Sequence, residues 1–157
     1  MPFLDVAVLP LRAVQALFSI IVLGLTAYII DEYRAAWWSP DSVDFMLFCS
    51  IWTLLAVAYL VLAPTRFPAA AHKYAIIGVE AVTMIFWFAA WVAVASYWGD
   101  VYRGSAKHGP VYSTGVAAIV FSAFIWLAFV ATTVVAALHV RRTARGDTAP
   151  PPQMQGV

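Results

Sequence analysis

The sequence predicts an all-α membrane protein, a bundle of four antiparallel transmembrane helices with both termini in the cytosol. Of the 157 residues, 64% are hydrophobic and only 11% are charged, which leaves too few polar residues to cover a soluble domain. The apolar residues form four long runs. Each run reaches the length of about 20 residues that a helix needs to cross a hydrocarbon core about 30 Å thick.

The runs define one transmembrane domain over residues 12–140, with expected spans at 12–30, 44–63, 74–97 and 113–139. The first run is expected to be a retained helix rather than a signal peptide, because Asp31 and Glu32 stand near its end where a cleavage site needs small residues. Residues 1–11 are a short N-terminus. Residues 141–157, rich in Pro, Gly and polar residues, are expected to form a disordered tail.

The basic residues predict the orientation in the membrane. An even number of spans places the N-terminus, the second loop and the tail on one side, which carries six of the nine basic residues. These six are Arg12, Arg66, Lys73, Arg141, Arg142 and Arg145. The positive-inside rule therefore puts both termini in the cytosol. There, Arg141, Arg142 and Arg145 follow the last span directly and are candidates for contact with anionic lipid.

The aromatic residues fall into two sets by depth. The aromatic residues at the membrane surface opposite the two termini are expected to anchor the chain in the headgroup region. Rings with a polar edge favour that region. These anchors are Trp37, Trp38, Trp98 and Tyr112. Three deeper rings, Trp52, Phe86 and Trp87, are candidates for packing or lipid contacts.

A single carboxylate, Glu80, interrupts the third apolar run, seven residues past Lys73. At roughly 10 Å into the helix it is costly unless it is paired, protonated or turned inward. Arg12 and Gln15 begin the first span from the same side and share a helix face, because they are three residues apart. We expect Arg12, Gln15 and Glu80 to form an intramembrane polar cluster. It would be structural, bind a lipid or partner, or translocate an ion.

No motif in the sequence supports catalysis. The histidines are scattered without metal spacing, and no phosphate loop or catalytic set is recognisable. We therefore expect no enzyme activity, no metal and no cofactor. No run of Lys and Arg suggests a nucleic-acid partner, and a domain that is mostly membrane has little surface to offer one.

Three segments carry a resemblance to a known family. The segments "RAVQALFSIIVLGLTAYII", "FMLFCSIWTLLAVAYLVLAP" and "AIIGVEAVTMIFWFAAWVAVAS" resemble the first three spans of fungal MARVEL-domain proteins, the group that includes the non-classical export proteins. The similarity runs from about Leu11 to Arg142. Its more specific positions are Arg12, Gln15, Tyr28, Trp52, Glu80 and the pair Phe86-Trp87.

The resemblance implies an M-shaped bundle of four helices with cytosolic termini. It also implies a non-enzymatic role in organising membrane domains, often rich in sterol or sphingolipid, or in vesicle traffic. The membrane would be the plasma membrane or one of the secretory pathway, and the partners would be lipids, further copies of the chain or other membrane proteins.

Two alternatives stay open at this point. One is a small proton-coupled transporter or channel subunit that uses Glu80. The other is an accessory subunit of a larger membrane complex, held through small residues of the third span. These small residues are Ala75, Gly78, Ala81, Ala89 and Ala93.

Overall fold

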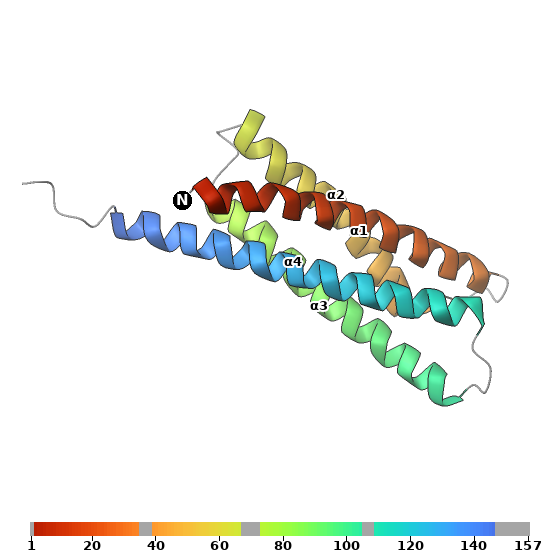
Figure 1. The fold of residues 1–157 in the computed structure, drawn as a ribbon. Helices are drawn as coiled ribbons and strands as arrows, with labels where there is room; N and C mark the ends of the chain where they lie inside the picture. Colours follow the sequence, from red (N-terminus) through yellow and green to blue (C-terminus); the bar gives the residue numbers. More distant parts are fainter. Residues whose placement is uncertain (1, 35–38, 67–72, 105–108, 147–157) are drawn as a thin grey trace, which may run out of the picture.

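Four long helices account for most of the computed structural model, which describes residues 2–34, 39–66, 73–104 and 109–146 (Figure 1). Helix α1 covers Pro2–Arg34, α2 covers Asp41–Arg66, α3 covers Lys73–Gly104 and α4 covers Pro110–Gly146. All four are long and apolar enough to cross a membrane, over Val8–Arg34, Asp41–Ala63, Tyr74–Asp100 and Pro110–Arg142. The expected all-α class with four membrane spans is confirmed.

The helices are longer than the expected spans. Helix α1 begins at Pro2, within the segment expected as a short N-terminus, and α4 continues to Gly146, beyond the expected start of a disordered tail at Arg141. Once a helix has formed, each further residue adds one hydrogen bond at little cost, so a stable span extends readily into polar flanking sequence.

Local sequence explains where α2 and α4 begin. The carbonyl of Pro40 accepts a hydrogen bond from the backbone N–H of Val43 at 2.8 Å, and the acids Asp41 and Asp44 in the first turn of α2 complement the helix dipole. Helix α4 starts with Pro110, a residue suited to the first helical position because its missing N–H would have no partner there.

The helices form a closed up-and-down ring in which each packs against two neighbours: α1 with α2 and α4, and α3 with α2 and α4. Helices α1 and α3 therefore lie across the bundle from each other. The N-terminus and the end of α4 lie at the same end, on the left in Figure 1. We call this the terminal end, and the other the distal end, where α1 and α3 finish and α2 and α4 begin.

The interior of the bundle holds polar side chains beside apolar ones, and many large apolar side chains face outward. Gln15 and Glu80 are both 0% exposed, whereas Leu55 is 66% and Ile85 58% exposed. Such an arrangement suits a lipid environment, in which an outward apolar side chain costs nothing and an unpaired polar group is expensive. The small residues Ala75, Gly78, Ala89 and Ala93 also lie on the exposed surface of α3, so they do not form the contacts between helices of one chain.

A close approach between two helices involves Gly115 of α4. A Cβ atom at this position would collide with the indole ring of Trp98 of α3. The indole is 3% exposed, and its Nε1 donates a hydrogen bond to the carbonyl of Tyr112 at 3.0 Å. The absence of a side chain at Gly115 thus allows the ring to be buried between α3 and α4.

Candidate functional site

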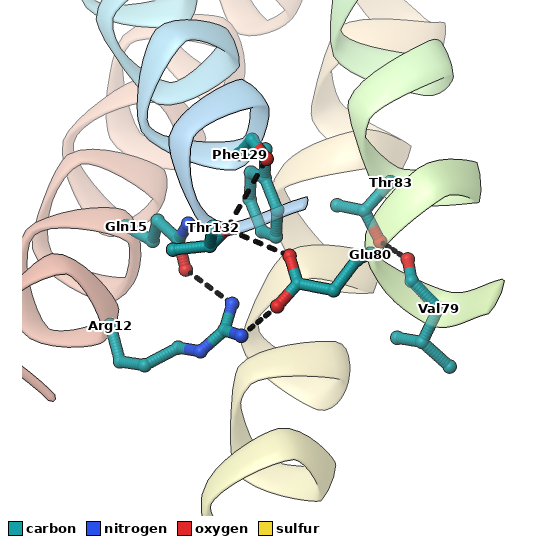
Figure 2. A network of polar contacts seen from close by, with 7 residues as sticks. All are labelled: Arg12, Gln15, Val79, Glu80, Thr83, Phe129 and Thr132. Atoms are coloured by element: carbon teal, nitrogen blue, oxygen red, sulfur yellow. Dashed lines mark hydrogen bonds and ion pairs between the residues drawn. The ribbon is translucent and has the colours of Figure 1, made fainter. Parts of the chain in front are cut away.

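The candidate site is a group of polar side chains inside the bundle near the terminal end (Figure 2). Helix α1 contributes Arg12 and Gln15, whose three-residue spacing points both into the interior. The guanidinium Nη1 of Arg12 donates a hydrogen bond to Oε1 of Gln15 at 2.9 Å. This contact lies within α1 and orients the guanidinium toward its partner on another helix.

Glu80 of α3 receives contacts on both carboxylate oxygens. Its Oε1 forms an ion pair with Nη2 of Arg12, and its Oε2 accepts a hydrogen bond from the hydroxyl of Thr132 of α4 at 2.8 Å. The amide Nε2 of Gln15 donates to the same hydroxyl at 3.3 Å. Arg12, Gln15, Glu80 and Thr132 therefore form one connected group, which we call the polar cluster.

The single hydroxyl proton of Thr132 has two possible acceptors. The carbonyl of Phe129, in its own helix, lies 3.2 Å away, whereas the carboxylate of Glu80 lies 2.8 Å away. A hydrogen bond to a charged acceptor is shorter and stronger than one between neutral groups. The contact with Glu80 is therefore the preferred one, and it connects α4 to the ion pair.

The polar cluster is almost entirely removed from solvent. Glu80 and Gln15 are 0% exposed and Arg12 is 6% exposed. Moving one charge into such a site costs several kcal/mol, and a partner of opposite charge repays this only with good geometry and further hydrogen bonds. Arg12 and Glu80 cancel each other's charge, and Gln15 and Thr132 supply the additional hydrogen bonds.

The geometry of the polar cluster favours a connecting role. It joins α1, α3 and α4, and the pair Arg12–Glu80 crosses the interior between two helices that are not neighbours in the ring. Among the described residues, no group of three His, Cys, Asp or Glu side chains could hold a metal ion. Both oxygens of Glu80 are engaged within the bundle, so they are not presented to a ligand in this conformation.

Thr132 was not foreseen as a member of the cluster. Its sequence neighbourhood indicates only that its hydroxyl can bond to its own helix, as the hydroxyls of Ser50 and Ser122 do with the carbonyls of Met46 and Ala118. No local signal shows which face of α4 turns toward Glu80. Only the depth of Thr132, in the half of the last span that leads to the C-terminus, is compatible with such a contact.

The deeper aromatic candidates occupy the contact between α2 and α3. The indole Nε1 of Trp87 donates to the hydroxyl of Thr53 at 2.8 Å, and that of Trp52 donates to Thr83 at 3.0 Å. Trp87 is fully buried and serves packing, whereas Trp52 and Phe86 are half-buried. The rings of Trp52 and Phe86 meet edge to face, with centroids 5.9 Å apart.

The expected aromatic anchors that the structure describes differ in burial. Trp98, expected as an anchor in the headgroup region, has its ring buried between α3 and α4, because Gly115 leaves room for it. Tyr112 is half-buried beside it. Trp37 and Trp38 lie outside the described residues.

The three arginines expected to contact anionic lipid all lie in α4, at the terminal end. The side chains of Arg141 and Arg142 are exposed. The backbone of Arg145 is helical, and its side chain lies outside the described part of the structure.

Comparison with known protein families gives a match. The family model for the MARVEL membrane-associating domain matches residues 6–135, which include the whole polar cluster. No curated protein and no solved structure matches the chain significantly.

Proposed function

Since the chain belongs to the MARVEL family of membrane-associating domains, we propose that it is a non-enzymatic integral membrane protein that organises lateral domains of lipid and protein. The resemblance of its first three spans to the non-classical export proteins supports a role in domains rich in sterol or sphingolipid, or in membrane traffic. The same resemblance favours the plasma membrane or a membrane of the secretory pathway as its location.

The proposal rests on the observation that the two buried charges are paired with each other. Arg12 and Glu80 form an ion pair inside the bundle, Gln15 accepts a hydrogen bond from Arg12, and Thr132 donates one to Glu80. A bundle that uses its intramembrane charges for assembly presents an apolar perimeter to its surroundings. Such a protein would act through the lipids and proteins that surround it.

The two ends of the bundle suggest how the protein is oriented. The excess of basic residues in segments at the terminal end supports cytosolic termini. In that orientation the exposed Arg141 and Arg142, followed by Arg145, would contact anionic lipid of the cytosolic leaflet. The exposed small residues of α3 offer a surface for self-association or for another membrane protein.

Proton transport through Glu80 is the second candidate function. One observation favours it: the hydroxyl of Ser19, one turn beyond Gln15 on α1, is buried without a hydrogen-bond partner among the described residues. Such a hydroxyl would be a second polar group inside the bundle, as a transport path requires. Transport would require Glu80 to leave both Arg12 and Thr132 during the cycle.

Live imaging of the chain with a C-terminal fluorescent protein tests the proposal. We expect immobile patches with slow recovery after photobleaching. Glu80→Gln and Arg12→Ala should disperse them, because both change the polar cluster. Arg34→Gln, which changes an exposed arginine at the distal end, is the matched control and should keep the patches.

A uniform, freely diffusing signal from the correctly folded protein would contradict the organising role. Proton flux into liposomes would then be measured with the purified chain. Flux that disappears in Glu80→Gln and persists in Arg34→Gln would assign the protein to transport. Stable purification with one large membrane partner would assign it to an accessory role.

A further inference from the structure

A second feature, distinct from the polar cluster, lies at the distal end of the bundle. An open groove of about 560 Å³ runs between α3 and α4. Its lining residues are Ala95, Trp98, Gly99, Arg103, Tyr112, Val116 and Ile119. Its volume falls within the range of about 300 to 1,000 Å³ that is usual for ligand sites.

The groove changes from polar to apolar along its length. Arg103 lies in the last turn of α3, just beyond the apolar span that ends at Asp100. Ala95 lies eight residues earlier, about 12 Å deeper along the helix. On the opposite wall, Tyr112 is followed by Val116 and Ile119. The groove therefore crosses from the headgroup region into the hydrocarbon region, as an amphiphile does.

At the polar end of the groove, Arg103 lines the wall, and its ion-pair partner Asp100 lies beside the groove without lining it. Nη1 of Arg103 lies 3.2 Å from Oδ1 of Asp100, and both side chains are largely exposed, at 81% and 77%. Exposed pairs of this kind contribute little to stability, so both groups can turn toward a ligand at low cost. A phosphate would bind the guanidinium, and an amine would bind the carboxylate.

A similar pair on α1 shows what the groove adds. Arg34 and Asp31 have the same spacing of three residues and similar exposures of 80% and 76%, and they also lie at the distal end. Arg34 is not among the residues that line the groove. The two arginines are thus matched in exposure and partner, and they differ in having an apolar groove beside them.

From these observations we infer that the α3–α4 groove binds one phospholipid whose headgroup carries both a phosphate and an amine. The phosphate contacts Arg103, the amine contacts Asp100, and the upper part of an acyl chain lies along Val116 and Ile119. A headgroup with negative charge alone would meet the carboxylate of Asp100, and a sterol has no charge to match either group. This inference extends the proposed organising function by naming a lipid class.

Native mass spectrometry of the full chain, released from nanodiscs with equal amounts of phosphatidylethanolamine and phosphatidylglycerol, tests the inference. We expect one retained phosphatidylethanolamine per chain. Arg103→Gln should lower its occupancy roughly tenfold, the ratio that corresponds to one hydrogen bond to a charged group. Val116→Trp should lower it similarly by filling the groove. The side chain of Arg103 is 81% exposed and Val116 is 39% exposed, so neither residue belongs to the buried core of the bundle.

Arg34→Gln is the control, and three results would contradict the inference. Arg34→Gln should retain the lipid as the original chain does. Equal retention in Arg103→Gln and Val116→Trp would overturn the inference, and so would preferential retention of phosphatidylglycerol or of an added sterol. Retention is measured on the isolated chain and does not depend on patch formation. Failure of the groove and failure of the organising function are therefore separable.

Discussion

Helix α1 contacts α3 across the bundle near each end, and these two contacts differ in kind. At the terminal end the contact is the ion pair between Arg12 and Glu80. At the distal end it is a hydrogen bond of 3.2 Å between the hydroxyls of Tyr33 and Tyr97. The first contact is charged, buried and joined to α4 through Thr132, whereas the second is neutral and half-buried.

The difference indicates that different kinds of interaction hold the helices together at the two ends of the bundle. Electrostatic attraction in a medium of low dielectric constant fixes α1, α3 and α4 relative to one another at the terminal end. At the distal end the helices depend on weaker contacts and on the packing of Trp98 against Gly115. That end also carries the open groove between α3 and α4. We therefore expect mutations at the terminal end to lower the free energy of unfolding more than mutations at the distal end.

The largest effect is expected from Glu80→Ala. This substitution leaves the buried guanidinium of Arg12 without its charged partner, which typically costs about 3 to 5 kcal/mol. The free energy of unfolding can be measured by titration with a denaturing detergent in mixed micelles. Asp31→Asn, which breaks an exposed pair, is the control and should cost less than about 1 kcal/mol. Equal losses in the two variants would remove the distinction between buried and exposed pairs.

The next effect is expected from Gly115→Ala at the distal end. The added methyl group collides with the indole of Trp98, and overpacking of this kind costs about 1 to 3 kcal/mol. Gly99→Ala is the matched control, because a Cβ atom there meets nothing within 4 Å. The control should be neutral or stabilising, since Ala favours a helix over Gly by up to about 1 kcal/mol. If Gly115→Ala were as stable as the control, the close approach would be refuted.

Two threonines between the ends of the bundle each accept a hydrogen bond from a tryptophan indole, and the two indoles differ in burial. Thr53→Val removes the acceptor of the fully buried Trp87 indole and should cost about 1 to 3 kcal/mol. Thr83→Val does the same to Trp52, which is only half-buried, and should cost less. Unfolding of the two variants under identical conditions gives the comparison directly. A larger loss in Thr83→Val would contradict the order of burial.

The smallest effect is expected from Tyr97→Phe. It removes one hydrogen bond between neutral hydroxyls in a half-buried site, which is worth about 0.5 to 1.5 kcal/mol. The same detergent titration measures it. A loss as large as that of Glu80→Ala would show that the distal contact matters as much as the ion pair.

The sequence predicted the fold class and three members of the polar cluster for clear physical reasons. Apolar run length is dictated by membrane thickness, so the four spans are readable directly. A charge inside such a run needs a partner, and the depth of Glu80 and the face shared by Arg12 and Gln15 left few choices. The structure brings these three side chains together.

Features that depend on the rotation of one helix against another could not be predicted. Thr132 joins the cluster because one face of α4 turns inward, and the sequence of α4 alone does not identify that face. The burial of the Trp98 ring against α4 could not be predicted either, because it depends on Gly115, which leaves room for the ring on a helix that follows later in the chain. The groove at the distal end likewise arises only from the packing of α3 against α4.

A double-mutant cycle on Arg12 and Glu80 tests most directly the central claim that the buried charges serve assembly. Arg12→Met and Glu80→Met should each destabilise the bundle strongly. The double variant, which buries no unpaired charge, should be about 2 to 3 kcal/mol more stable than the sum of the single losses predicts. A coupling energy near zero would mean that the pair does not hold α1 to α3, and the account of Glu80 as an assembly residue would be wrong.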